Sequence, residues 1–474
     1  MRRRIIRILM AIVIIYTVAL SIQAGLTALH AKSYVASLSG EYDRTTLDNQ
    51  SNQVASDVNR LFTLLNVPVV KQIASVAGVD FSPIRDEVVA TIKASSWLAG
   101  ADAPKRYMIA FQNSAEARGT GGILGAFAII DLNKSALTVV RTGSNAVLYS
   151  LKDVPVKVPA EFTKLYGKNP AILQNSNLSP HFPYGAEIWM GLWKNQFGEQ
   201  LDGVIAVDPS SLSYVLKATG PITLASGEVI TSKNVVADTL QKAYKRYEND
   251  NNARKQYLVD IMNAAAGKIT SGQFSKIEMA KAIKRGLIEN RILLYSRDQV
   301  AQKVLSTVRL GGFLGKDPNN EYRVVIQNID ASKLDYYLQK SVVIETKSCK
   351  NILKTQVRVK LTNTLKSGKG LPAYVLTRAD KGKPTNLVTG QHRFKLFIYG
   401  PTNAKLVSVL RENRTSGLGG GSAERGRPIY VADVDLAPGQ SENLLANFAG
   451  GVGNITFVDQ PLVRPTQLAI KGGC

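Results

Sequence analysis

Residues 107–125 read YMIAFQNSAEARGTGGILG, a strand-like apolar run that leads into a polar, glycine-rich stretch. Four polar or charged side chains follow the apolar run: Gln112, Asn113, Glu116 and Arg118. Three glycines then mark a turn before the chain becomes apolar again: Gly119, Gly121 and Gly122. Glycine lets a ligand or a second backbone approach closely, so this stretch predicts an anion-binding edge at the end of a buried strand. A tight turn between two core strands, with Arg118 in solvent, is the alternative.

Strand-like and helix-like patterns alternate around this stretch. Period-two and continuous apolar runs predict strands at 107–111, 126–132, 136–140 and 203–207. Apolar residues at three- and four-residue spacing predict helices at 210–218, 235–247, 254–265 and 276–288. The mixed order indicates an α/β or α+β domain over residues 105–315.

The pattern of apolar and polar residues changes after this domain. Residues 320–474 contain short alternating runs at 324–326, 342–345, 356–362, 393–398, 405–410 and 429–435, separated by Gly, Pro, Asn and Lys. Short strands divided by such turns predict a C-terminal β-sandwich.

The N-terminus has the pattern of a membrane anchor. Four arginines precede residues 8–29, a stretch without charge: Arg2, Arg3, Arg4 and Arg7. About 20 apolar residues span a bilayer, and the basic flank predicts a cytoplasmic N-terminus with the bulk of the chain extracytoplasmic. We therefore expect a single-pass transmembrane anchor within 1–30, followed by a helical stalk or hairpin at 31–104. A cleaved signal peptide is the alternative.

The charge balance points to anionic partners. The 474 residues include 59 Lys and Arg against 36 Asp and Glu, a formal net charge of +23. An extracytoplasmic location argues against nucleic acid as the partner. Phospholipid head groups and envelope polymers that carry phosphate or uronate remain as partner classes.

The two cysteines, Cys349 and Cys474, are compatible with one disulfide in an oxidising compartment. Two unpaired thiols are the alternative. The three histidines lie far apart, and no H-x-x-x-H or C-x-x-C pair occurs, so the sequence predicts no zinc site.

Three further motifs have both a structural and a functional interpretation. Residues 175–184, NSNLSPHFPY, read as an ordered loop or as a rim near Arg118. Asp208 precedes Pro209 and is expected to cap the helix that follows. Residues 244–256, YKRYENDNNARKQ, read as a solvated face or, through their arginines, as a phosphate clamp.

Most of the chain resembles a family of actinobacterial membrane-anchored proteins that carry the domain of unknown function 4012. The matching signatures are FQNSAEARGTGG at 111–122, NSNLSPHFP at 175–183, DGVIAVDPSSLSYVLKATGP at 202–221 and SKLDYYL at 332–338.

The order of these motifs also resembles, more distantly, the LytR-CpsA-Psr phosphotransferases, which transfer glycopolymers from polyprenyl-pyrophosphate carriers by means of arginines and magnesium-binding aspartates. The resemblance implies four phosphate-facing arginines: Arg118, Arg141, Arg246 and Arg254. It also implies Mg²⁺ as a cofactor, although Asn113 stands where those enzymes carry an acidic metal ligand, and an amide is a poor ligand for Mg²⁺. No metal ligand is therefore assigned, and Asn113 is grouped with the residues that bind the anion.

The resulting hypothesis is an envelope protein that binds, and could transfer, a polyprenyl-phosphate-linked glycan or another anionic envelope polymer. If the protein is an enzyme, Glu116 or Asp250 is the candidate acid, base or metal ligand. The alternative is a non-catalytic scaffold or adhesin with a degenerate phosphotransferase-like domain. An apolar tunnel that ends at Arg118 would favour the first hypothesis.

Overall fold

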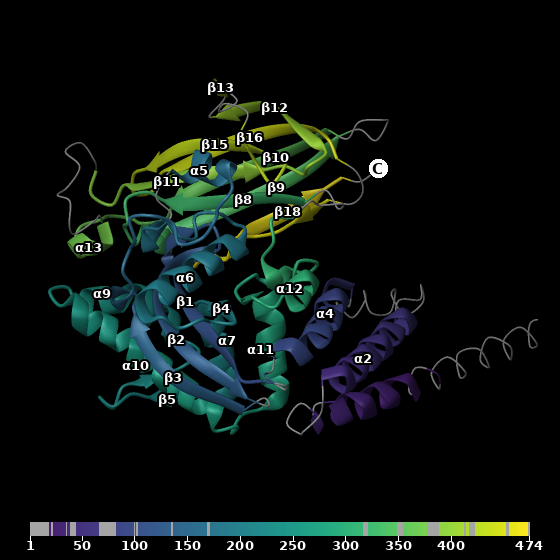
Figure 1. Ribbon diagram of the computed structural model, residues 1–474. Coiled ribbons are helices and arrows are strands. Elements are labelled where there is room, and N and C mark those ends of the chain that lie inside the picture. Colours follow the sequence, from purple (N-terminus) through teal and green to yellow (C-terminus); the bar gives the residue numbers. More distant parts are fainter. Residues whose placement is uncertain are drawn as a thin grey trace, which may run out of the picture.

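The computed structural model describes residues 19, 22–34, 36–37, 44–65, 82–98, 100, 103–133, 136–167, 171–315, 321–347, 354–376, 388–411, 414–416, 422–451 and 455–472. An N-terminal helical segment, a mixed α/β domain and a β-rich region follow one another along the chain (Figure 1). The mixed α/β architecture and the β-rich C-terminal region are thus confirmed. Cys349 and Cys474 lie outside the described residues, as does most of the predicted anchor.

The N-terminal helices α2 (Arg44–Leu65) and α4 (Ser82–Leu98) pack against each other. Leu47, Val54 and Val58 of α2 lie in one apolar cluster with residues of α4. The three- and four-residue spacing of these side chains places them on one face of α2, as an amphipathic helix requires. Among the described residues, no helix is both long and apolar enough to cross a bilayer.

The α/β domain is built on a five-stranded sheet of order β3-β2-β1-β4-β7. The strands are β1 (Lys105–Arg118), β2 (Gly121–Asn133), β3 (Ala136–Ser144), β4 (Gly203–Val207) and β7 (Leu293–Ser296). Only β1 and β4 run parallel, and the other neighbours are antiparallel. The β1–β4 crossover carries α5 (Ala160–Tyr166) and α6 (Phe182–Phe197), which supplies Trp189 and Trp193 to the core on one face of the sheet.

The other face of the sheet is covered by α7 (Pro209–Thr219) and α10 (Asn251–Thr270), which share a core with Phe111 and the small hairpin of β5 (Ile222–Thr223) and β6 (Val229–Ile230). Between them lie α8 (Val235–Ala237), a π-helix (Asp238–Lys242) and α9 (Ala243–Arg246). Helices α11 (Lys276–Ile288) and α12 (Gln299–Leu305) flank β7. The predicted cap is confirmed, because Asp208 accepts a hydrogen bond from Ser211 N at 2.7 Å at the start of α7.

The β-rich region consists of two sheets that share one apolar core. One sheet has the order β13-β12-β16-β10-β9-β18 and the other β14-β15-β11-β8-β17. The long strands are β8 (Glu321–Asn328), β9 (Leu338–Lys347), β10 (Lys354–Asn363), β11 (His392–Tyr399), β12 (Ala404–Arg411), β15 (Arg427–Leu436) and β16 (Ser441–Gly450). The short ones are β13 (Arg414–Ser416), β14 (Ser422–Glu424), β17 (Thr456–Phe457) and β18 (Gln467–Lys471). Alternate residues of both sheets, such as Val357 and Leu396, meet in this core.

The strand predicted at 107–111 continues to Arg118, so the sequence-based end point was wrong. Irregularities in the pairing with β2, after Phe111 and after Asn113, let the strand continue past its apolar part. The hairpin turn is reduced to Gly119 and Thr120, and Ala117 is buried in the core of the β-rich region. The polar half of β1 therefore lies at the junction of the two domains.

Candidate functional site

A cavity of about 970 Å³ opens at this junction, beside the polar half of β1. Its wall combines β1, the loop before α6, the start of α10 and the segment that links β8 to β9. Five basic side chains and one carboxylate line it: Arg118, Arg254, Lys255, Lys333, Lys395 and Glu116. Of the predicted site residues, Asn113, Glu116, Arg118 and Arg254 are brought together here. A cavity with this charge imbalance suits an anionic ligand.

Arg118 is buried at the base of the cavity and is held by three segments of the chain. Its Nε donates to Gln174 O at 2.8 Å, and its Nη1 donates to Asn328 O at 3.2 Å. Its Nη2 donates to Glu116 Oε1 at 2.9 Å. The guanidinium thus fastens β1 to the loop before α6 and to β8, and most of its donors are already used.

Glu116 lies between two cations. Lys333 Nζ donates to Glu116 Oε2, and Arg118 holds the other carboxylate oxygen. Burial alone would raise the pKa of Glu116, but the charges of Lys333 and Arg118 outweigh it and hold that pKa below its usual value. For Lys333, burial is likewise outweighed by the carboxylate, which raises the pKa of the ammonium. Both groups are therefore ionised at neutral pH, and Glu116 holds no proton to give as a general acid.

Arg254 and Lys255, in the first turn of α10, have no carboxylate partner among the described residues. Arg254 donates from Nη2 to Asn251 Oδ1 at 2.6 Å, and its guanidinium lies 4.5 Å from the ring centre of Tyr244. Burial, and then the charge of Arg254, lower the pKa of the half-buried Lys255. An anion placed here would relieve the repulsion between these two cations.

The cavity adjoins a small apolar pocket beneath α10. This pocket, of about 40 Å³, shares Asn113, Gly125 and Leu258 with the larger cavity. The rest of its wall is mainly apolar: Phe111, Ala126, Pro209, Leu212, Leu240, Ile261 and Met262. At the boundary, Asn113 Nδ2 donates to Tyr244 Oη at 2.6 Å. The site thus offers a cationic space beside an apolar one.

The described residues of the cavity do not fit Mg²⁺. Its one carboxylate, Glu116, is already held by Lys333 and Arg118. Asn113 stands where the LytR-CpsA-Psr enzymes carry an acidic metal ligand, and its Oδ1 accepts a hydrogen bond from Ala115 N at 3.1 Å. No group of three metal-ligating side chains occurs among the described residues.

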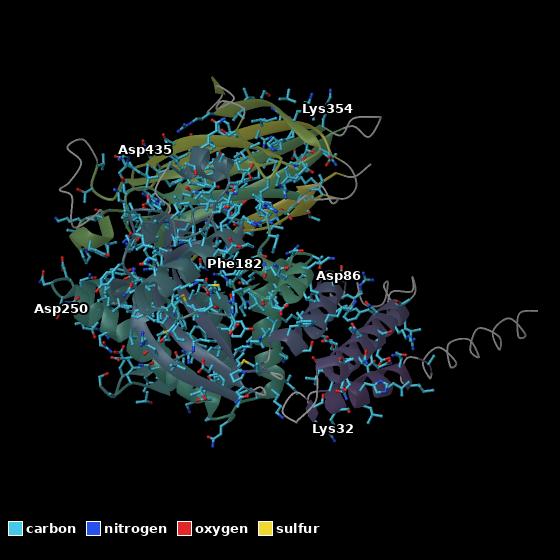
Figure 2. All side chains as sticks on the ribbon, in the orientation of Figure 1. Lys32, Asp86, Phe182, Asp250, Lys354 and Asp435 are labelled. Carbon is cyan, nitrogen blue, oxygen red and sulfur yellow. The ribbon has the colours of Figure 1, made fainter. Side chains whose placement is uncertain are left out.

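Three predicted site residues lie elsewhere. Arg141 stacks over Phe197 at 4.7 Å from the ring centre, and Arg246 Nη1 donates to Glu228 Oε2 at 2.6 Å. Asp250 is exposed, at the periphery of the α/β domain (Figure 2), and accepts a hydrogen bond from Ala253 N at 2.9 Å as the cap of α10. Each has a local structural partner and none lines the cavity.

The sequence signatures interlock around the β1–β2 hairpin. Asn177, from 175–183, donates from Nδ2 to Thr120 Oγ1 at 2.9 Å and to Gly122 O at 2.8 Å. A Cβ at Gly119 would lie 2.2 Å from Leu178 O, so the glycine allows close approach of a second backbone. The signature at 332–338 supplies Lys333 and also Asp335, which accepts from Ala117 N at 2.9 Å. Three stretches far apart in sequence thus form one buried junction.

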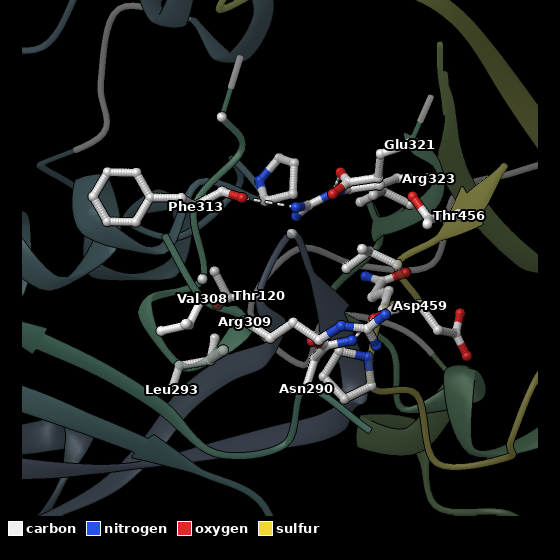
Figure 3. Close-up of a pocket in the computed structure, with 18 of the residues that line it drawn as sticks. Thr120, Asn290, Leu293, Val308, Arg309, Phe313, Glu321, Arg323, Thr456 and Asp459 are labelled. Carbon is white, nitrogen blue, oxygen red and sulfur yellow. Dashed lines mark hydrogen bonds and ion pairs between the residues drawn. The ribbon is translucent and has the colours of Figure 1, made fainter. Parts of the chain in front are cut away.

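A second cavity, of about 590 Å³, lies on the other side of the hairpin turn and is lined by Gly119 and Thr120 (Figure 3). Its charged side chains balance, with three acidic and three basic residues: Asp86, Glu321, Asp459, Arg309, Arg323 and Arg427. Arg323 Nε donates to Glu321 Oε1 at 2.6 Å, and its Nη2 donates to Phe313 O at 2.7 Å (Figure 3). The charge balance makes this cavity less suited to an anion than the first.

Sequence reasoning missed Lys255, Lys333, Lys395 and Tyr374. Lys333 lies within the signature SKLDYYL, and Lys255 directly follows the predicted Arg254. The position of each in the sequence could therefore have pointed to the site. Lys395 and Tyr374 come from the β-rich region, and no local pattern indicates that they face the α/β domain.

Part of the α/β domain matches a known protein family. Residues 102–244 match a family described as a protein of unknown function (DUF4012). The match contains the signatures at 111–122, 175–183 and 202–221, and it supports the resemblance to this family. No curated protein matches the chain.

Several solved structures are distantly similar. The alignment with a Streptococcus agalactiae protein covers 44% of this chain and 74% of that protein's chain, at 14% sequence identity and a TM-score of 0.27. A transcriptional regulator from Bacillus subtilis aligns with 46% of this chain and 84% of its own, at 12% identity and a TM-score of 0.24. The alignment with a Listeria innocua protein covers 47% of this chain and 85% of that protein's chain, at 15% sequence identity and a TM-score of 0.23.

Proposed function

We propose that this protein binds a polyprenyl-phosphate-linked glycan, or a related anionic envelope polymer, in the cavity at the domain junction. The observation that carries the proposal is the cavity's five basic side chains against one carboxylate, beside an apolar pocket with shared walls. An amphipathic anion needs both environments. The proposal includes the predicted membrane anchor and an extracytoplasmic location, and it excludes nucleic acid as the ligand.

The anion would bind first at Arg254 and Lys255. Arg118 and Lys333 already share Glu116, and Lys395 Nζ donates to Asp433 Oδ1 at 2.6 Å. Arg254 and Lys255 have no such carboxylate, so the electrostatic gain from a phosphate is largest there. The prenyl chain would extend from this point toward Leu258 and the apolar pocket.

Binding is better supported than transfer. The charges of Lys333 and Arg118 lower the pKa of Glu116, despite its burial, which makes it a poor proton donor. Asp250 caps α10 and lies outside the cavity. We therefore propose a binding protein related to the LytR-CpsA-Psr phosphotransferases in the order of its motifs, and we assign no catalytic residue.

The alternative, a non-catalytic scaffold or adhesin, is favoured by one observation. The signature at 111–122 is buried between the domains, and Gln460 Nε2 donates to Arg118 O at 2.6 Å. A protein that uses this motif only to join its domains would need no ligand in the cavity.

The test is a binding titration of the full-length protein with a soluble polyprenyl-pyrophosphate analogue, with and without Mg²⁺. Replacing Arg254 by Gln removes a charge-assisted contact, which is worth about 1.5–3 kcal/mol, so we expect a loss of about tenfold to a hundredfold in affinity. Lys255→Ala should weaken binding in the same direction.

Arg246→Gln is the matched control, because Arg246 is a neighbouring arginine that pairs with Glu228 and lies outside the cavity. Its affinity for the analogue should equal that of the wild type. Equal affinity of Arg254→Gln, Lys255→Ala and wild type would favour the scaffold instead.

A further inference from the structure

Helix α11 has an unusual solvent face. Its inner side buries Ala282, Gly286 and Leu287 beneath the domain surface. The opposite side carries four residues at i, i+4, i+7 and i+11: Ile277, Lys281, Lys284 and Ile288. Residues with this spacing share one stripe of a helix. The stripe begins and ends with isoleucine and has two lysines between.

The isoleucines of α11 are open to solvent. The exposed fraction is 70% for Ile277, 43% for Ile288 and 45% for the neighbouring Ile283. Because an α-helix has about 3.6 residues per turn, Ile277 and Ile288 lie on the stripe with the two lysines, whereas Ile283 lies on another side of the helix. The stripe thus combines two exposed isoleucines with two lysines. Part of each isoleucine thus remains open to solvent among the described residues.

The same helix is strongly basic. Its sequence KIEMAKAIKRGLI has four basic residues and one acidic residue, a balance of 4 − 1 = +3. Lys281 pairs with Glu278 at 2.7 Å, and Arg285 pairs with Glu289 at 2.7 Å. Lys276 and Lys284 form no ion pair with any residue that the structure describes. The face therefore offers uncompensated positive charge together with apolar side chains.

We infer that the solvent face of α11 docks on an anionic lipid surface. Isoleucines at the ends of the stripe would enter the boundary between head groups and acyl chains, and lysines would contact lipid phosphates. A soluble anionic polymer would attract the lysines but would not need the isoleucines. This docking surface is separate from the cavity, and it concerns how the domain sits on a bilayer rather than which ligand it holds.

The position of α11 agrees with this partner. In Figure 1, α11 lies at the right-hand side of the α/β domain, beside α4. Helix α4 belongs to the helical segment that follows the predicted anchor at 8–29. Helix α11 thus lies beside a helix of the same N-terminal region that carries the predicted anchor.

The test uses lysine reactivity in the full-length protein. The protein is placed in detergent, in nanodiscs of phosphatidylcholine, and in nanodiscs that also contain phosphatidylglycerol, and exposed lysines are acetylated and quantified by mass spectrometry. We expect Lys281 and Lys284 to be protected only with the anionic lipid, and high salt to remove that protection. Lys405, an exposed residue of β12, is the internal control. Strand β12 lies at the top of the molecule in Figure 1, away from α11.

Substitutions separate lipid from other partners. Replacing Lys284 by Ala should weaken the lipid contact about fivefold, since each basic residue near the surface contributes about 1 kcal/mol, and the readout is the protection of Lys281. Ile277→Ser and Ile288→Ser should weaken it as well. Val407→Ser, at an exposed apolar position of β12, should leave it unchanged.

Three outcomes would overturn the inference. Equal lysine reactivity in the two kinds of nanodisc would exclude docking on anionic lipid. Loss of protection by Lys284→Ala but not by the isoleucine variants would indicate attraction to any polyanion. Protection that appears in detergent and grows with protein concentration would indicate a second copy of the chain.

Discussion

Lys333 Nζ forms a buried ion pair with Glu116 Oε2, although the two residues are 217 positions apart. Glu116 belongs to the α/β domain and Lys333 precedes the first 3-10 turn of the β-rich region. The pair therefore joins the domains at the floor of the cavity. Arg118 shares the carboxylate, so two cations flank Glu116.

The first prediction concerns Lys333→Met. The substitution leaves Glu116 with one of its two cations in a buried site, and breaking a buried pair in this way costs about 3–5 kcal/mol. We expect a clear fall in the urea midpoint of the full-length protein, measured by circular dichroism. The fall should be smaller in the double variant Glu116→Gln/Lys333→Met, which removes the buried anion as well.

Lys354→Met is the control for that experiment, because Lys354 is exposed on β10. Its midpoint should match that of the wild type within about 0.5 kcal/mol. If Lys333→Met proved equally harmless, the ion pair would not hold the junction together.

The second prediction compares two glycines. At Gly122 an added Cβ would lie 2.2 Å from the carbonyl carbon and oxygen of Asn113, so the β1–β2 hairpin would have to move. At Gly267, in α10, a Cβ would meet nothing within 4 Å. Gly122→Ala should therefore lower the thermal midpoint strongly, whereas Gly267→Ala should raise the free energy of unfolding by about 0.5–1 kcal/mol. Similar midpoints for the two variants would mean that the hairpin does not need close backbone contact.

Much of the element order was predictable from sequence because apolar periodicity reports which face of a strand or helix is buried. The predicted helix at 276–288 coincides with α11, and the strand at 203–207 coincides with β4. Strand β16 escaped prediction because Glu442, Asn443 and Asn447 are poor strand formers, although Glu442 is buried and Arg411 Nη2 donates to it at 3.0 Å.

The site was harder to predict because its partners come from distant parts of the chain. The polar residues after Phe111 do not look like a buried strand until Asn328, Lys333 and Gln460 supply their hydrogen bonds. The presence of an arginine in the sequence also does not show which group its guanidinium contacts in the fold. Arg254 lines the cavity, whereas Arg141 stacks on an aromatic ring.

The third prediction concerns Glu424. Its carboxylate is buried and accepts hydrogen bonds from three hydroxyl groups, those of Ser179, Tyr166 and Tyr399, at 2.6–2.8 Å. Burial raises the pKa of Glu424 above its usual value of 4.5, and no cation pairs with it among the described residues. The folded state thus binds this proton more tightly than the unfolded state, so the stability linked to it is present at low pH and is lost as the pH rises above about 4.5.

Glu424→Gln should remove the loss of stability that accompanies ionisation of Glu424 as the pH rises. We expect the variant to have a higher urea midpoint than the wild type at pH 7, and the difference should shrink as the pH falls toward 4.5. Glu248→Gln, at an exposed position, should show no difference at either pH. A Glu424→Gln protein that is less stable than the wild type at pH 7 would show that the three hydroxyl groups favour the charged form.

The last prediction separates two roles for Asp250. The structure gives this residue a capping role, because its carboxylate accepts a hydrogen bond from Ala253 N at the start of α10. Asp250→Ala should therefore cost about 0.5–2 kcal/mol of stability, whereas Asp250→Asn should cost little, since asparagine caps helices equally well. Neither variant should change the affinity for the polyprenyl-pyrophosphate analogue, because Asp250 does not line the cavity. An acid, base or metal ligand would give the opposite pattern: Asp250→Asn would abolish turnover or metal-dependent binding while leaving the stability of the fold intact.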